Sequence, residues 1–345
     1  MSLKHILFFN LHLLCSQPEY PSVPKQIESN CSILCVCSQK FELNAILQQC
    51  CILPGCKALK QKQYGNITVH YLLYRGNYIA LAVTGKNFLS TSQRLFKLFP
   101  LLPNVEKVFF VGIGGSLDPK LKPGDVCIPE KWACHTTGYL YNKTSGKTHA
   151  VRYEPEHANF KIFYPSSMET GVNSNDEIIR TDLLTCPPSL FNSVQAIVSR
   201  SINPTYEFSV NCGGIGVSGT VFVDNDKYRQ HLCTTYGAQV VDMESFAFAL
   251  ACCEFQKPFC IIRSISDLAG NHNYGNTLEN TIDDHRSEAA SNAAIVFTQI
   301  LRTLPLSTRN HPKMPLKFIK QCLFPPKNPE FNIQNIPHSP KAAVH

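Results

Sequence analysis

Residues 240–270 read VVDMESFAFALACCEFQKPFCIIRSISDLAG, and this stretch decides the fold class. Residues 242–254 are apolar nearly all round, which is the pattern of a buried helix. Residues 258–266 follow as a continuous apolar run, which is typical of a strand covered on both faces. Helices that alternate with such strands indicate an α/β domain, in which a largely parallel sheet is buried between helices.

The alternation continues on both sides of this stretch. Arg75-Gly76-Asn77 separates two β-rich runs and indicates a hairpin. Further strands are predicted at 32–38, 67–74, 78–84, 107–111 and 209–217, and helices at 41–49, 88–99 and 285–304. The sequence therefore predicts a single three-layer α/β domain around a central mixed, largely parallel sheet.

This domain is expected to span residues 31–303, between two extensions. Residues 1–30 resemble a weak signal sequence, so the compartment stays open: a cytoplasmic location is slightly favoured over a secretory or vacuolar one. Residues 140–205 show little periodicity and are predicted to be an insertion. Residues 304–345 hold eight of the 23 prolines and six basic residues against one acidic residue, which indicates a disordered tail.

Composition excludes several classes of function. Of the 345 residues, 44% are hydrophobic and 17% charged, which suits a chain with a sizeable core, and no apolar run reaches the roughly 20 residues of a membrane-spanning helix. Most of the net charge of +7 lies in the tail, which argues against a nucleic-acid-binding core. The 16 cysteines include no Cys-x-x-Cys pair, and no motif implies a metal or a cofactor.

Ligands of α/β domains bind beyond the carboxyl ends of strands, and three predicted turns lie at such ends. They are residues 112–115, which read GIGG, residues 218–224 and residues 264–270. The glycine cluster lacks the third glycine of a dinucleotide-binding fingerprint, so a tight turn explains it as well as ligand contact does.

Charged residues make two of these regions more specific. Asp242 and Glu244 begin the apolar helix, where the alternative to a functional role is capping of the helix. Arg263, Ser266 and Asp267 end the buried strand that follows, and an acid that closes such a strand indicates an active site.

Together these pieces resemble the nucleoside phosphorylase and nucleosidase superfamily. The likeness is greatest to the methylthioadenosine/S-adenosylhomocysteine nucleosidases and to the plant bark and vegetative storage proteins. Trp132 and the VFVDN segment at 221–225 point towards the storage-protein branch. The matching stretches keep the family's order and are residues 32–47, 82–99, 105–132, 217–231 and 240–270.

The resemblance implies roles on the two sides of a purine nucleoside. Asp267 resembles the general acid that protonates purine N7, so that the base leaves more readily. Glu244 resembles the residue that holds the ribose 2′-hydroxyl, and Met243 lies against the sugar. Phe222 resembles the aromatic residue that stacks on the purine, and Val223 offers backbone contacts.

The resemblance also implies how the nucleophile is held. Glu42 matches the acid that activates water, and Arg263 resembles the basic partner that positions the carboxylates. Gly114 and Gly115 would let the backbone approach the ribose, and Ser266 belongs to the substrate-binding set. Glycosidases use the same arrangement, with an acid on the side of the leaving group and a carboxylate on the side of the sugar.

Hydrolysis is favoured over phosphorolysis. Phosphorylase relatives carry an arginine at the position of Phe110 and a hydroxyl residue at Ile113, and here both positions are apolar. A phosphate dianion without such donors would be poorly held.

The sequence therefore predicts a purine nucleosidase for adenosine-type or methylthio nucleosides, with no cofactor. The alternatives are a storage or defence-related protein with weak catalysis, and a phosphorolytic enzyme. The expected partners are a small-molecule purine nucleoside and a second copy in a homodimer, with residues 132–135 as a candidate contact.

Overall fold

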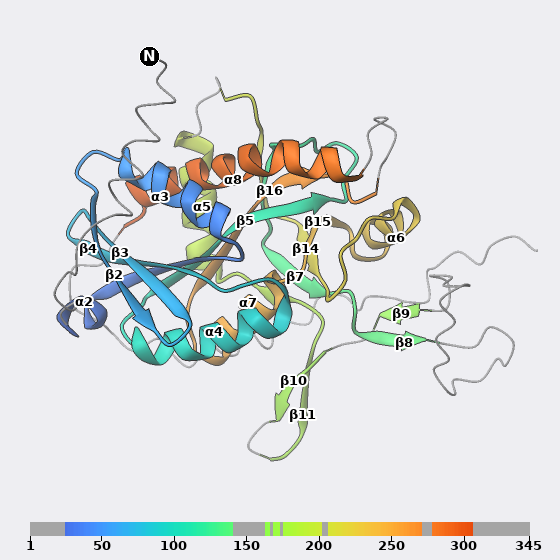
Figure 1. The fold of residues 1–345 in the computed structure, drawn as a ribbon. Helices are drawn as coiled ribbons and strands as arrows, with labels where there is room; N and C mark the ends of the chain where they lie inside the picture. Colours follow the sequence, from blue (N-terminus) through green and yellow to red (C-terminus); the bar gives the residue numbers. More distant parts are fainter. Residues whose placement is uncertain are drawn as a thin grey trace, which may run out of the picture.

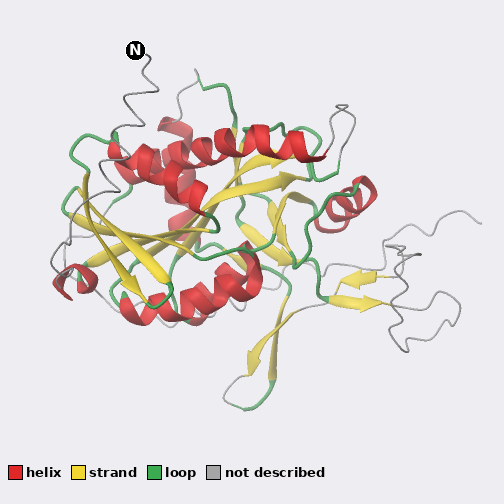
Figure 2. Ribbon diagram, in the orientation of Figure 1, coloured by secondary structure: helices red, strands yellow, loops and turns green. Residues whose placement is uncertain are grey.

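The computed structural model describes residues 25–140, 163–165, 168–172, 175–201, 206–270 and 278–305, and its ribbon is drawn in Figures 1 and 2. The strands are β1 (Cys31–Cys37), β2 (Lys57–Tyr64), β3 (Ile67–Tyr74), β4 (Asn77–Val83), β5 (Lys107–Ser116), β6 (Val126–Ile128), β7 (Lys131–Cys134), β8 (Gly138–Leu140), β9 (Phe163–Pro165), β10 (Met168–Val172), β11 (Ile178–Thr181), β12 (Leu184–Thr185), β13 (Val210–Cys212), β14 (Ile215–Ser218), β15 (Ala238–Asp242) and β16 (Phe259–Asp267). The helices are α2 (Lys25–Ser29), α3 (Lys40–Cys51), α4 (Asn87–Leu101), α5 (Pro188–Ser201), α6 (Asp226–Tyr236), α7 (Ser245–Glu254) and α8 (Leu278–Thr303).

One mixed sheet organises the described chain. Its strand order is β12-β7-β14-β15-β5-β1-β4-β3-β2, and β16 lies beside β5 and also pairs with β6, which in turn pairs with β13. Strands β4, β1, β5 and β16 are mutually parallel, and so are β7, β14 and β15. The second group meets the first through a short antiparallel pairing of β15 with β5.

Helices cover both faces of this sheet (Figures 1 and 2). Helices α3, α5 and α8 pack together on one face, and α4 packs with α7 on the other. Strand β1 and all but the last residue of β16 are buried, because these strands lie between the helical layers. Eight of the ten residues of α7 are buried as well. The predicted three-layer α/β class is thus confirmed.

Free cysteines form part of this core. Cys35, Cys37, Cys252 and Cys260 are each at most 1% exposed, and the described cysteines are free thiols. Burial raises the pKa of Cys35 and Cys37 well above the usual value, so these thiols stay protonated and pack as small apolar side chains.

Two expectations were wrong, and the stretch expected to have little periodicity contains a helix, although its status as an insertion stays a prediction. Residues 112–115 are not a turn, because β5 runs through them to Ser116. The predicted insertion at 140–205 contains α5, which packs on α8 and buries apolar residues at helical spacing. Trp132 and His135 are fully buried within one chain, so this segment is not available as a dimer contact. The homodimer itself stays a prediction.

Other expectations fall on parts of the chain that are not described. Residues 1–24 and 306–345, which hold most of the predicted signal-like extension and tail, lie outside the described residues. Among the helices that are described, none combines the length and apolar character needed to cross a membrane.

Candidate active site

The site forms where the two groups of parallel strands meet end to end. The last residues of β15 pair antiparallel with the last residues of β5, in the register Val240 to Ser116 and Val241 to Gly115. Strand β16 ends beside the same point, with Asp267 opposite Gly115. Because the carboxyl ends of all three strands converge here, side chains that are far apart in sequence share one pocket.

Asp267 is brought to this point by an irregularity in β16. The register with β5 shifts between Ile265 and Asp267, as at a β-bulge, and bulges near active sites often re-aim a side chain. Its Oδ2 accepts a hydrogen bond from Ser266 Oγ at 2.8 Å, and Oδ1 accepts one from Ala269 N at 2.9 Å. Burial raises the pKa of Asp267. The hydrogen bonds from Ala269 N and Ser266 Oγ lower this pKa, the nearby charge of Asp224 raises it, and the charge of Arg286 lowers it.

Glu244 enters the same pocket from the start of α7. Its side chain makes no capping bond to that helix; instead Oε1 accepts a hydrogen bond from Asn87 N, at the start of α4, at 2.7 Å. Burial, and then the charge of Asp242, raise the pKa of Glu244 to about 7, whereas Arg263 and the Asn87 N–H lower it. Glu244 is therefore a buried carboxyl group that titrates near neutral pH.

Asp242, in contrast, has the capping role that the sequence left open for both acids. Its Oδ1 accepts hydrogen bonds from Glu244 N and Ser245 N at the start of α7. Its Oδ2 accepts from Arg263 Nε at 2.7 Å, and both side chains are buried. Capping and a buried ion pair make Asp242 a structural member of the site.

Arg263 lies beneath the pocket and not in its wall. Its guanidinium stacks on the Phe110 ring at 3.9 Å and donates to Asp242 and Ser245. Among the described residues its ion pair is with Asp242 and not with Glu42 or Glu244. It approaches Glu42 at Gly112, where an added Cβ would lie 2.4 Å from both Arg263 Nη1 and Glu42 Oε1. The side chains of Arg263 and Glu42 therefore both pack against Gly112.

Glu42 is held by four donors. Its Oε2 accepts from Ser38 N, Ser38 Oγ and Gln39 N at 2.8–2.9 Å, and Oε1 accepts from Ile113 N at 3.0 Å. The Gln39 contact is one half of a capping box on α3. Glu42 is only 1% exposed and lies behind the pocket wall that Ser38 and Gln39 form.

The remaining candidates line the pocket itself. Phe222 is 53% exposed and Val223 is buried, and both lie in the loop between β14 and α6. The wall comprises Ser38, Gln39, Lys86, Ile113, Gly114, Gly115, Val221, Phe222, Val223, Val241, Asp242, Met243, Glu244, Ser266, Asp267 and Arg286. All seven predicted substrate-binding residues and Asp267 are in this set, whereas Glu42 and Arg263 lie behind it.

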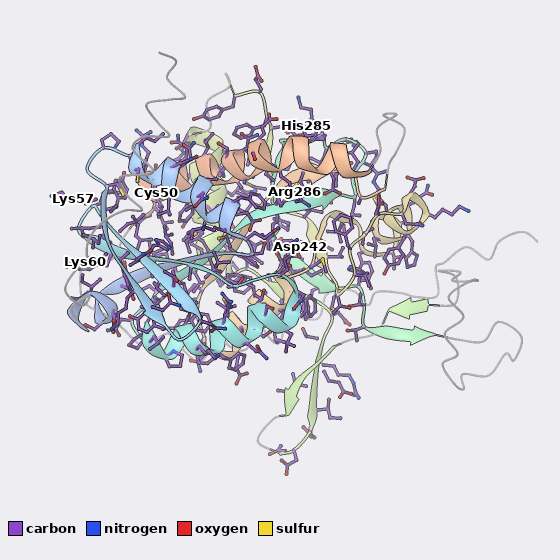
Figure 3. All side chains as sticks on the ribbon, viewed as in Figure 1. Cys50, Lys57, Lys60, Asp242, His285 and Arg286 are labelled. Carbon is purple, nitrogen blue, oxygen red and sulfur yellow. The ribbon has the colours of Figure 1, made fainter. Side chains whose placement is uncertain are left out.

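Two basic residues of the wall were missed by the sequence analysis. Lys86 immediately precedes α4, and Arg286 lies on α8. Figure 3 shows Arg286 on the inner side of α8, towards Asp242, and its neighbour His285 on the outer side. Within the described ranges, no group of three or more His, Cys, Asp or Glu side chains could hold a metal ion.

Gly115 is required by the close approach of Asp267. A Cβ added at Gly115 would lie 2.8 Å from Asp267 Oδ1 and 3.2 Å from Ala269 Cβ. We expect Gly115→Ala to displace the Asp267 carboxyl group and to lower turnover by about 10²-fold, the cost of a misplacement of about 1 Å.

Gly65→Ala is the matched control for this substitution. Gly65 has φ of +60° in an open turn where a Cβ would touch nothing, so alanine costs backbone strain there without reaching the site. Equal losses of turnover in the two variants, measured beside their melting temperatures, would show that Gly115 matters only for stability.

Comparison with known proteins shows which family this chain belongs to. The phosphorylase superfamily model matches residues 32–302. The chain belongs to the phosphorylase superfamily. It is 27% identical over 208 residues to a 5′-methylthioadenosine/S-adenosylhomocysteine nucleosidase of Mycobacterium bovis. The aligned stretch covers 58% of this chain and 71% of that relative. It is also 27% identical over 165 residues to an aminodeoxyfutalosine nucleosidase of Helicobacter pylori, which covers 48% of this chain and 57% of that relative.

Solved structures of this superfamily share the fold. The futalosine hydrolase of Helicobacter pylori superposes with a TM-score of 0.59 at 20% identity, over 80% of this chain and 99% of that one. A 5′-methylthioadenosine/S-adenosylhomocysteine nucleosidase from the same organism gives the same TM-score and identity, over 80% and 100%. The predicted superfamily and the nucleosidase likeness are confirmed, and the storage-protein branch stays a prediction.

Proposed function

We propose that this superfamily member is a purine nucleosidase, which hydrolyses the N-glycosidic bond of adenosine-type or methylthio nucleosides. One observation carries the proposal: Glu244, which is buried, and Asp267, which is half-buried, both have a raised pKa and line one pocket together with Phe222. The names of the curated relatives, which are nucleosidases, support the same reaction.

On the base side, Asp267 would supply the proton. A raised pKa makes the carboxyl group of Asp267 a readier proton donor than an exposed aspartate, and transfer of that proton to purine N7 neutralises the leaving base. Ser266 Oγ and Ala269 N fix the carboxyl group from behind. The exposed ring of Phe222 offers a face on which the purine can stack.

On the sugar side, Glu244 would accept the 2′-hydroxyl. The Asn87 N–H occupies one lone pair of Oε1, which leaves acceptor capacity for a ribose hydroxyl. Met243 and the glycines of β5 complete the wall on which the ribose would lie. A Cβ at Gly114 would lie 2.9 Å from Val240 and from the Val241 carbonyl, so only glycine fits there.

Water is the proposed nucleophile. Glu42 Oε1 takes one N–H bond in the structure, so a lone pair remains for a water molecule. Phe110, at the position where phosphorylase relatives carry an arginine, is fully buried against Arg263 and offers no donor. Ile113 likewise gives its backbone N–H to Glu42.

The product of the sugar half tests this nucleophile. We expect purine release at the same rate in phosphate-free and phosphate buffers, with free ribose or its 5′-substituted form as the second product. A sugar 1-phosphate, formed only when phosphate is present, would show phosphorolysis instead.

The backbone N–H of Asn87 is one of the groups that lower the pKa of Glu244, against the larger effect of burial. Its φ of +71° is left-handed, and this conformation directs its N–H at Glu244 Oε1. We expect Asn87→Val to leave this conformation and lose the bond, because a β-branched residue is strained there. Since the N–H lowers the pKa of Glu244, its loss should move the acid limb of the kcat/KM profile above its midpoint of about 7.

Asn87→Gly is the matched control, because glycine adopts positive φ freely and keeps the backbone N–H. Its acid limb should stay at the wild-type position. Identical profiles for the valine and glycine variants would contradict a role of this backbone conformation in holding Glu244.

A further inference from the structure

The pocket carries a cation on its proposed sugar side that the reaction above does not use. Lys86 lines the pocket, is exposed to solvent, and directly precedes Asn87, whose N–H binds Glu244. Among the described residues, no hydrogen bond or ion pair engages its ammonium group. Lys86 is therefore a free positive charge beside the carboxyl group that would hold the ribose.

The acids of the wall do not balance this charge. Asp242 is committed to Arg263 at 2.7 Å in a buried pair. Burial raises the pKa of both acids, to about 7 for Glu244, and neither Glu244 nor Asp267 forms an ion pair with Lys86. Arg286 adds a second cation to the wall, close enough to Asp267 to act on its titration. Lys86 is thus a cation of the wall that no described acid pairs with.

We infer that the site selects purine nucleosides that carry an anionic substituent on the sugar, and that the Lys86 ammonium is the partner of that anion. The inference rests on the proposed function, since it takes Glu244 as the ribose ligand. An uncharged sugar would leave Lys86 to solvent, whereas a phosphate or carboxylate group would gain a charge-assisted hydrogen bond.

Phosphate monoesters are the probes, because they place a dianion at a known carbon. The experiment compares kcat/KM for adenosine, adenosine 5′-monophosphate and adenosine 3′-monophosphate at low ionic strength. One monophosphate is expected to exceed adenosine by at least tenfold. The preference should shrink as salt is added, because this contact is open to solvent.

Variants of Lys86 test whether this residue causes the preference for a monophosphate. Lys86→Ala should reduce the ratio of monophosphate to adenosine kcat/KM by about tenfold, and Lys86→Arg, which keeps the charge, should retain most of it. Lys57→Ala is the matched control: Lys57 is an exposed lysine of β2, and Figure 3 labels it at the opposite end of the sheet from Asp242. Its ratio and its activity should equal those of the wild type.

Several results would overturn the inference without touching the proposed function. They are cleavage of adenosine with no preference for either monophosphate, or a preference that survives Lys86→Ala. A rate that depends on Lys86 only through inorganic phosphate would overturn both the inference and the proposed hydrolysis, because the anion would then be a free co-substrate. Failure of the proposed function is distinct: no nucleoside would be cleaved, and calorimetric binding of adenosine 5′-monophosphate against adenosine would then decide whether Lys86 selects the anion.

Discussion

Asp267→Asn is expected to lower turnover by roughly two to four orders of magnitude, the range that one positioned proton transfer contributes. Asparagine keeps the size of the side chain and much of its hydrogen bonding to Ser266 and Ala269, but it has no proton that it can transfer to purine N7. Purine affinity should change much less than turnover. Steady-state kinetics and calorimetric binding of free adenine measure the two effects separately.

A purely structural role of Asp267 predicts another outcome. Loss of a capping interaction costs about 0.5–2 kcal/mol of stability, and activity would then fall only as far as the folded fraction falls. Asp242→Asn provides the comparison, because it weakens the buried ion pair with Arg263, and breaking such a pair costs about 3–5 kcal/mol. If Asp267→Asn loses stability but no turnover in the folded protein, the proton-donor role is wrong.

Glu244→Gln is expected to be the second most damaging change. The amide is uncharged and has one oxygen, which already accepts the Asn87 N–H, so the ribose 2′-hydroxyl exchanges a carboxylate acceptor for the remaining lone pair of a neutral carbonyl. kcat/KM for nucleosides should fall by about 10²-fold or more, because a hydrogen bond to a charged group is lost at a site that needs precise positioning. Free adenine should bind nearly as before.

The pH profile gives a separate signature of Glu244. The carboxylate form accepts the hydroxyl, so wild-type kcat/KM should decline as pH falls through about 7 and Glu244 takes up a proton. Glutamine does not titrate, so the variant should lose this acid limb. A variant that keeps both the limb and its midpoint would show that another group is responsible.

Most of the pocket could be predicted from the sequence, because its parts lie at the ends of strands. Asp267 and Ser266 close a continuous apolar run, and Met243 and Glu244 begin an apolar helix, so their positions follow from local pattern. That these segments share one pocket depends on the head-to-head pairing of β15 with β5. No local signal shows this pairing; the resemblance to a known superfamily implied only that these residues act on one nucleoside.

The residues that were missed show where sequence reasoning stops. Lys86 precedes an amphipathic helix and Arg286 lies on one, so each has the pattern of an ordinary solvated side chain. The sequence does not reveal helix α5 readily, although Leu190, Val194 and Ile197 have helical spacing, because a long segment with little periodicity precedes it. Strand β2 was missed because its lysines interrupt the apolar alternation, as is common for edge strands.

Purine release in phosphate-free buffer tests the central claim most directly. The wild-type protein and Asp267→Asn are each incubated with 5′-methylthioadenosine, adenosine and inosine, free base is quantified over time, and binding of adenine is measured on the same preparations. The account predicts catalytic release of base from at least one nucleoside by the wild type, its near-complete loss in Asp267→Asn, and adenine binding by both. Wild-type protein that binds adenine but releases none from any nucleoside, in water or in phosphate, would contradict it and favour the storage-protein alternative.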